Sequence, residues 1–281
     1  MFDLIKATVL GIIEGLTEFL PISSTGHLII GSQILNFRPQ LQGIFEIFIQ
    51  LGAIVAVLIY YAQDLAQDAR TIHKDESVQR WWLAILVAAL PLLALGFVFS
   101  DALEVFLRPS IVGLSMIVGG IIIYAAEIYE SYRVTTLTTV PPTPSSTLAV
   151  PEGEVTVLQA LVIGLFQLLA LMPGMSRSAT TIIGGMFAGL SRSVATRFSF
   201  YLSMPVLGSA TIYSPLKHLP EINNRDMLLL IVGAIVSGIV ALGMIAWLLR
   251  YVSRNNFVPF AVYRIIVGII ILLLVYAGIL T

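Results

Sequence analysis

The sequence predicts an all-α polytopic membrane protein with an inverted-topology repeat, six spanning helices and two re-entrant broken-helix elements. The first observation is composition: 58% of the 281 residues are hydrophobic and 11% are charged, with a mean hydropathy of +0.96. Soluble domains carry about 25% charged residues. The second observation is that apolar runs of about 20 residues recur, which is the length that a spanning helix needs. The third is that the two halves of the chain repeat one pattern of residues.

Several classes of protein are not supported by the composition. The formal net charge is -1, which gives no support for a nucleic-acid partner. The chain has no Cys, so disulfides, thiolate nucleophiles and Cys-ligated metals are excluded. The first residues do not form a basic region, and the apolar segment after them contains Glu14 and Glu18. A cleaved signal peptide is therefore not expected.

Each half of the chain is expected to begin with a broken apolar segment and to continue with three spans. The first repeat covers residues 1–133, and the second covers 155–281. Between them lies a polar linker, residues 134–154, which is rich in Thr, Ser and Pro. The expected spans are, in order, about 44–62, 81–99, 109–129, 198–213, 227–249 and 259–280.

The two halves match at several positions. Gly11-Ile-Ile-Glu14 corresponds to Gly164-Leu-Phe-Gln167, and Phe45 through Gln50 corresponds to Phe198 through Ser203. Further matches pair Pro21 with Pro173, Ser24 with Ser176, and Pro109 with Pro259. Three crossings in each half would invert the second half relative to the first. In inverted repeats of this kind, interrupted helices meet near the midplane and mark the binding site.

Lys and Arg are divided unevenly between the two expected sides of the membrane. One side holds Arg70, Lys74, Arg80, Arg133, Arg192, Arg197, Arg250 and Arg254. The other side holds Arg38, Arg108, Lys217 and Arg225. Because cytoplasmic loops carry the excess of Lys and Arg, both termini and the mouth of the first re-entrant element are expected outside.

The first break concentrates polar residues in an apolar segment. Glu14 and Glu18 are four residues apart, so on a helix both carboxylates share one face. Pro21 interrupts the helix, Ser23, Ser24 and Thr25 can cap the next one, and Gly26 permits a tight turn or a close backbone approach. The carboxylates either sit at a wet helix end, are neutral and hydrogen-bonded, or form a proton or hard-metal site for Mg²⁺ or Ca²⁺.

The second break complements the first with groups that suit a phosphate. A helix start after Pro173 and Gly174 would present free N–H groups and a positive dipole end. Arg177 adds a bidentate cation, and hydroxyls follow at Ser176, Ser178, Thr180 and Thr181. The simpler alternative is a helix start with Arg177 reaching to the membrane interface.

Ser24 and His27 are three residues apart at the start of a short helix, so they can share a face. A Ser beside a His base is a pattern typical of an activated nucleophile. The pattern also occurs by chance, because a lone His is often structural.

These motifs resemble those of the membrane-integral undecaprenyl-diphosphate phosphatase family. The matching stretches are Glu14-Gly-Leu-Thr-Glu18, Pro21-Ile-Ser-Ser-Thr-Gly-His27 and Pro173-Gly-Met-Ser-Arg-Ser-Ala-Thr-Thr181. The resemblance implies hydrolysis of a C55 isoprenyl diphosphate to the monophosphate carrier lipid of cell-wall synthesis, with resistance to bacitracin. It also implies a divalent metal, Mg²⁺ or Ca²⁺, and a multi-pass protein of the bacterial plasma membrane whose active site opens to the periplasmic or outer face.

The resemblance and the residues together give a set of expected roles. Glu14, Glu18, Ser24, His27 and Arg177 are expected to be catalytic, with Glu14 and Glu18 as the metal ligands. The residues expected to bind the substrate phosphates are Ser23, Thr25, Gly26, Gly174, Ser176, Arg177, Ser178 and Thr181. Either Ser24 or a water attacks, and His27 transfers a proton. The partner is the polyprenyl diphosphate lipid, and a homodimer is left open.

Two other readings compete with a phosphatase. An ion-coupled transporter or a polyprenyl-phosphate flippase would also use inverted repeats, broken helices and buried acids. A structural membrane scaffold would leave the residues of the two breaks unexplained.

Overall fold

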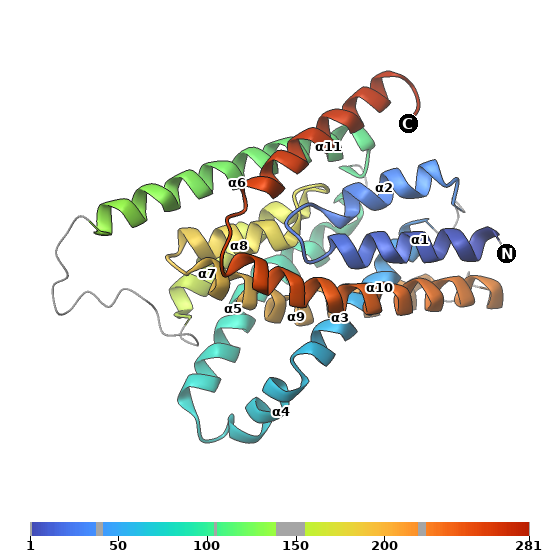
Figure 1. Cartoon of the computed structure of the whole chain (residues 1–281). Coiled ribbons are helices and arrows are strands. Elements are labelled where there is room, and N and C mark those ends of the chain that lie inside the picture. The colour runs from blue at the N-terminus through green and yellow to red at the C-terminus, as the bar shows by residue number, and fades with distance from the viewer. Residues whose placement is uncertain (1, 38–41, 104–105, 139–154, 219–222, 281) are drawn as a thin grey trace.

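The computed structural model describes residues 2–37, 42–103, 106–138, 155–218 and 223–280. Its regular elements are helices, as the sequence predicts (Figure 1). In order they are α1 (Phe2–Thr17), α2 (Ser24–Ile34), α3 (Gln42–Tyr60), α4 (Ala62–Thr71), α5 (Glu76–Leu103), α6 (Pro109–Thr138), α7 (Val157–Gln167), the 3-10 helix η2 (Leu168–Leu171), α8 (Arg177–Phe187), α9 (Arg192–His218), α10 (Asn224–Val252) and α11 (Val258–Tyr276).

Five helices in the described part of the chain are long and apolar enough to cross a membrane. They are α3, α5, α6, α10 and α11. The remaining predicted span, residues 198–213, falls in α9, which has 27 residues but carries Arg, Ser and Thr side chains along its first turns. The protein is thus a multi-pass membrane protein, and the expected helical class is confirmed.

Both predicted breaks are present, and the helices that follow them begin at N-caps of the same geometry. α1 and α2 form a hairpin whose turn lies near the middle of the molecule (Figure 1), and α7 packs on α8 after the second break. The N-cap residues Ser23 and Ser176 have positive φ values of 72° and 69°. Their hydroxyl oxygens accept hydrogen bonds from Gly26 N and Ala179 N, each at 3.3 Å. A non-glycine residue in this region stores strain of about 1–3 kcal/mol, and such strain clusters at functional sites.

The long helices pack in pairs that surround the two breaks. α11 lies along α6, while α10 packs on both α1 and α3 (Figure 1). On the other side of the bundle, α5 contacts α7 and α9. Glycine allows the closest of these approaches: a Cβ added at Gly52 of α3 would lie 1.9 Å from the Ala234 carbonyl oxygen of α10. Small residues at helix contacts are typical of membrane bundles because they let backbones approach closely.

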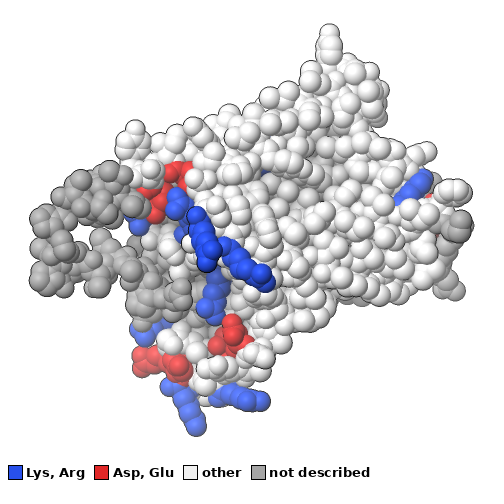
Figure 2. All heavy atoms as spheres, viewed as in Figure 1, with Lys and Arg blue, Asp and Glu red and all other residues white. Residues whose placement is uncertain are grey.

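Charged residues are concentrated at one end of the molecule. On the face shown in Figure 2, most of the visible Lys, Arg, Asp and Glu side chains lie at the end opposite the two chain termini, which are both at the right-hand end in Figure 1. Between the ends, uncharged residues form a broad surface. Large apolar side chains of the helices, such as Leu158, Ile239 and Ile266, are exposed in the isolated chain. A bilayer is the environment in which such a surface is stable.

Two details differ from the sequence prediction. Gly26 lies within the first turn of α2 rather than in a tight turn, because Ser23 already makes the sharp change of direction. Its small size matters for packing, since an added Cβ would lie 2.6 Å from Met116 Sδ. The helix α6 continues to Thr138, past the expected start of the linker at residue 134, and residues 139–154 lie outside the described chain.

Candidate active site

Both breaks line one cavity of about 800 Å³ in the middle of the bundle. Its polar wall consists of Glu18, Ser23, Ser24, Thr25, Gln50, Gly174, Ser176, Arg177 and Ser209. Its apolar wall consists of Ile47, Leu92, Leu93, Gly96, Ala170, Leu171, Met172, Pro173, Val206 and Leu207. The volume lies within the range of about 300–1,000 Å³ that is typical of ligand sites. The N-terminal turns of α2 and α8 therefore contribute to the same space.

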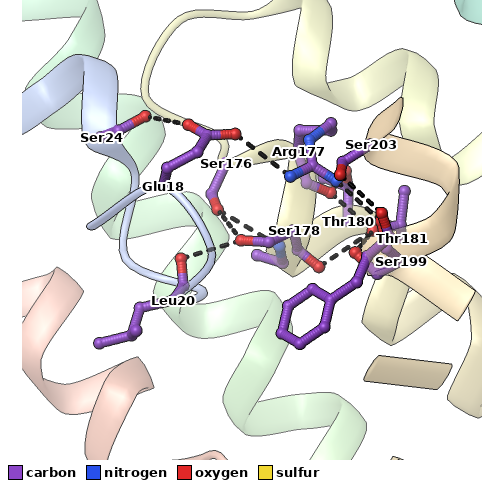
Figure 3. Close-up of polar contacts among 12 residues, drawn as sticks. Glu18, Leu20, Ser24, Ser176, Arg177, Ser178, Thr180, Thr181, Ser199 and Ser203 are labelled. Carbon is purple, nitrogen blue, oxygen red and sulfur yellow. Dashed lines mark hydrogen bonds and ion pairs between the residues drawn. The ribbon is translucent and has the colours of Figure 1, made fainter. Parts of the chain in front are cut away.

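Glu18 connects the two halves of the polar wall. One carboxylate oxygen, Oε2, accepts a hydrogen bond from Ser24 Oγ at 2.7 Å (Figure 3). The other oxygen, Oε1, accepts from Arg177 Nη2 at 3.2 Å. Glu18 lies just beyond the end of α1, where its N–H still bonds the Glu14 carbonyl, so the side chain is directed into the break.

Arg177 is the first residue of α8, and its side chain bonds to α9 as well as to Glu18. Its Nη1 donates to the Ser199 carbonyl of α9 at 3.1 Å, and its Nε has no hydrogen-bond partner. The side chains of Arg177 and Glu18 are only 8% and 6% exposed, so this ion pair is buried. A guanidinium with an unused N–H beside the cavity can still donate to a bound anion.

Two of the predicted phosphate ligands bond to other protein groups instead of lining the cavity. Ser178 Oγ donates to the Leu20 carbonyl at 2.8 Å and contacts Ser176 Oγ at 3.0 Å (Figure 3). Thr181 Oγ1 contacts Ser199 Oγ at 2.7 Å. Neither Ser178 nor Thr181 lines the cavity, and both are buried. The cavity-facing members of the predicted phosphate set are Ser23, Thr25, Gly174, Ser176 and Arg177.

His27 is not brought together with Ser24. Its Nδ1 is 2.7 Å from the Ser23 carbonyl oxygen, and its Nε2 is 2.7 Å from the Tyr263 hydroxyl. A carbonyl can only accept, so Nδ1 carries a proton and donates to Ser23; in a neutral ring, Nε2 would then accept from the Tyr263 hydroxyl. The rings of His27 and Tyr263 are also stacked, with centroids 5.6 Å apart. The hydrogen bonds of Ser24 and His27 thus go to other groups, and the expected proton transfer by His27 stays a prediction.

Glu14 is fully buried in α1, and neither of its carboxylate oxygens has a hydrogen-bond partner. It is close enough to Glu18, Glu46 and Arg177 to interact with them electrostatically. A buried carboxylate without partners is costly unless it is protonated or binds a cation.

The sequence as a whole matches the family described as "Bacitracin resistance protein BacA" over residues 7–270. The chain belongs to this family. An undecaprenyl-diphosphatase of Deinococcus radiodurans is 42% identical over 282 residues, which cover 99% of this chain and 97% of that protein. An undecaprenyl-diphosphatase of Cupriavidus necator is 41% identical over 293 residues, which cover 98% of this chain and 96% of that protein. The resemblance inferred from the motifs is therefore confirmed.

In this BacA family member, the predicted metal site consists of the carboxylates of Glu14 and Glu18. The described residues contain no cluster of three His, Asp or Glu side chains that could hold an ion by themselves. Glu14 nevertheless offers two unengaged oxygens, and Glu18 follows it by one turn. Mg²⁺ usually takes one or two carboxylates and completes its coordination with substrate phosphate and water. The two carboxylates are donors of the type that Mg²⁺ takes, and of the two only Glu18 lines the cavity.

Several residues of the site were not predicted from the sequence. Gln50 lines the cavity from α3, Ser199 holds Arg177, and Tyr263 holds His27. Gln50 and Ser199 lie within the two matched stretches that start at Phe45 and Phe198, so the internal repeat was a usable signal. No local pattern in the sequence pointed to Tyr263.

Proposed function

We propose that the chain hydrolyses undecaprenyl diphosphate to undecaprenyl phosphate and inorganic phosphate, and so recycles the lipid carrier of cell-wall synthesis. The observation that carries this proposal is the buried Ser24–Glu18–Arg177 array at the junction of two helix N-termini, on a cavity with a long apolar wall. The names of the relatives in the family support it.

The cavity offers different surfaces to the two parts of the substrate. The diphosphate would lie against the N-terminal turns of α2 and α8, where N–H groups and the helix dipoles favour anions. Ser176 and Arg177 would donate to its oxygens. The first isoprene units would lie along the apolar side, which includes Ile47 and Leu92. The rest of the prenyl chain would extend into the bilayer.

Ser24 is the nucleophile in this proposal, and Glu18 is its base. Ser24 Oγ already donates to Glu18 Oε2 at 2.7 Å, within the range that proton transfer requires. As the Ser24 oxygen bonds to the terminal phosphorus, the proton passes to Glu18 and the bond to the bridging oxygen breaks. The lipid monophosphate leaves, and a phosphoserine remains. Glu18 passes this proton to the oxygen of the departing monophosphate and is again a carboxylate. A water then attacks the phosphorus of the phosphoserine and gives one proton to Glu18, which returns it to the Ser24 oxygen as phosphate is released.

Arg177 would stabilise the negative charge on the transferring phosphoryl group. In the free protein it is held by Glu18 and Ser199, which places it at the cavity before the substrate enters. A divalent cation held by Glu14 and Glu18 would neutralise part of the diphosphate charge. His27, whose ring nitrogens contact Ser23 and Tyr263, would fix the first turn of α2; proton transfer by His27 would require it to leave one of these contacts.

The proposed membrane arrangement is an inverted repeat, with the α1–α2 and α7–α8 hairpins as re-entrant elements. The matching strained caps at Ser23 and Ser176 support a repeat, and the equivalent contacts of α1 with α10 and of α7 with α5 support it further. The concentration of Lys and Arg at the end away from the termini supports a cytoplasmic location for that end (Figure 2). The site would then open toward the periplasmic or outer face of the plasma membrane.

The experiment is phosphate release from a prenyl diphosphate by the purified protein in detergent, compared with the Ser24→Ala variant. Ser209→Ala is the matched control, because Ser209 also lines the cavity but bonds a carbonyl of its own helix. We expect Ser24→Ala to lose turnover and Ser209→Ala to retain it. With substrate labelled in the terminal phosphate, rapid acid quench of the wild type should trap label on the protein.

Absence of phosphate release by the wild type, or transport of the lipid without hydrolysis, would refute the phosphatase proposal. Full turnover by Ser24→Ala would refute only the assignment of the nucleophile, and would transfer that role to water.

A further inference from the structure

Arg264 of α11 is a buried cation that the proposed reaction does not use. Its side chain is 0% exposed and lies in a span that is otherwise rich in Ile, Leu and Val. In the described part of the chain its hydrogen-bond acceptors are all backbone carbonyls. Ionisable residues inside membrane spans are costly, and their default interpretation is functional. An apolar side chain would fill the same space at lower cost if packing were the only requirement.

The three acceptors of Arg264 belong to three different segments. Nη1 donates to the Pro21 carbonyl in the first break at 3.2 Å, and Nη2 donates to the Gly174 carbonyl in the second break at 2.8 Å. Nε donates to the Met116 carbonyl of α6 at 3.3 Å. The planar guanidinium is suited to this, because its N–H groups have a fixed spacing. One side chain therefore sets the distance between the two breaks.

The two carbonyls occupy equivalent places in their breaks. Pro21 comes two residues before the strained cap Ser23, and Gly174 comes two residues before the strained cap Ser176. Holding each carbonyl fixes the peptide that leads into the cap. Because the cap begins the helix, this also fixes where the first N–H groups of α2 and α8 point.

The neighbouring helix α6 is shaped to admit the guanidinium. A Cβ at Gly119 would lie 2.0 Å from Arg264 Nη2, so any larger residue there would displace the group. The preceding residue on α11, Tyr263, has its hydroxyl 2.7 Å from Nε2 of His27 in α2. Adjacent residues of α11 thus contact both breaks and the first turn of α2.

We propose that Arg264 is a positioning residue for the phosphatase reaction: by bridging the Pro21 and Gly174 carbonyls it holds the two helix N-termini at the separation that one diphosphate requires. This inference rests on the proposed function. It extends the proposed function by assigning the alignment of the N-termini of α2 and α8 to a side chain outside the sequence motifs. Misplacement of reacting groups by about 1 Å can cost on the order of 10²-fold in rate.

The test compares kcat, KM and the thermal midpoint of Arg264→Lys, Arg264→Met and Gly119→Ala in detergent. Lysine keeps the charge but cannot bridge the carbonyls, and Gly119→Ala displaces the guanidinium without removing it. The matched control is Gly113→Ala on the same helix, where an added Cβ would meet the Gly268 carbonyl at 3.1 Å and lie away from Arg264. We expect Arg264→Lys and Gly119→Ala to lower kcat by about 10²-fold, whereas Gly113→Ala keeps the wild-type kcat at a comparable loss of thermal midpoint.

The proposal is overturned if Arg264→Lys restores the wild-type kcat. It is also overturned if kcat falls only in proportion to the thermal midpoint across all variants, including Gly113→Ala. If Arg264→Met does not fold, the comparison of kcat between Gly119→Ala and Gly113→Ala still tests the proposal.

A second readout does not depend on turnover. The chain has no Cys, so Thr25→Cys introduces a single thiol on the cavity wall. Its rate of alkylation should change at least several-fold when Gly119→Ala is added and stay unchanged with Gly113→Ala. An unchanged rate in both would count against the positioning role. If the wild type released no phosphate, the proposed function would fail while this labelling test remained valid.

Discussion

Replacing Glu18 with Gln tests the central array most directly, because the change removes a charge and keeps the shape. Each Glu18 oxygen has one partner: Ser24 on Oε2 and Arg177 on Oε1. Gln retains one acceptor oxygen, so it can serve one of these partners, and its amide cannot take a proton from Ser24. The variant should lose both the proposed base and the compensation for the Arg177 charge.

The burial of the Glu18–Arg177 pair sets the expected loss of stability, and the proposed role of Glu18 as base sets the expected loss of turnover. Exposed ion pairs contribute about 0–1 kcal/mol, but these side chains are only 8% and 6% exposed. Breaking a buried pair costs roughly 3–5 kcal/mol because one charge is left without its partner. Arg177 retains the Ser199 carbonyl and borders a cavity, so we expect the lower end, about 3 kcal/mol. Loss of a general base should lower turnover by about 10²–10⁴-fold.

The double variant Glu18→Gln/Arg177→Gln separates stability from catalysis. It removes both charges, so the thermal midpoint should recover much of what either single variant loses. Turnover should stay as low as in the worse single variant. Phosphate release and thermal midpoint would be measured on the same purified samples.

A second ion pair serves as the control for this experiment. Glu127 accepts from Arg192 at 2.5 Å and from the Phe257 N–H, away from the cavity. Glu127→Gln should lower the thermal midpoint and leave kcat unchanged. Wild-type turnover in Glu18→Gln, or recovery of turnover in the double variant, would refute the roles assigned to Glu18 and Arg177.

Three further predictions follow from other parts of the molecule. Gly52→Ala should destabilise the α3–α10 contact by about 1–3 kcal/mol, because the added Cβ would lie 1.9 Å from a carbonyl oxygen. Gly243→Ala, whose added Cβ would meet nothing within 4 Å, should leave the thermal midpoint unchanged or raised. Equal thermal midpoints in the two variants would contradict this prediction. A chelator should abolish phosphate release by the wild type, and Glu14→Gln should raise the Mg²⁺ concentration needed for half-maximal rate; full activity in chelator would exclude the cation. Tyr276→Cys, at a position 93% exposed, should react with an impermeant thiol reagent in intact cells, and reaction only after lysis would reverse the proposed orientation.

The sequence predicted the breaks well because their signals are local. Pro21 and Pro173-Gly174 interrupt apolar runs, and the serines that follow are good helix caps, so the starts of α2 and α8 follow from short-range chemistry. The use of Ser23 rather than Gly26 for the sharp turn was not predictable, because Gly is the usual residue at positive φ. The strain at Ser23 is tolerated only because surrounding contacts hold it.

Side-chain partners were predicted less well, because they depend on packing between distant segments. The four-residue spacing placed the Glu14 and Glu18 carboxylates near each other, but it did not show that Glu18 lies just beyond the end of α1, in the break. Glu18 therefore lines the cavity while Glu14 stays buried in the bundle. In the same way, the spacing of Ser24 and His27 allowed a contact, but Tyr263 from the last helix engages His27 instead.

The two broken segments divide the chemistry between them, although their backbones are alike. Each supplies a helix N-terminus that begins at a strained serine, which is a general anion site. The first segment adds a hydroxyl and a carboxylate at Ser24 and Glu18, and the second adds the cation of Arg177. Neither set would be complete alone, because the proposed nucleophile and base would lack a cation for the phosphate, and Arg177 would lack its counter-charge. Contacts that join the breaks, from Ser178 to the Leu20 carbonyl and through Arg264, are therefore as necessary for the proposed reaction as the motifs themselves.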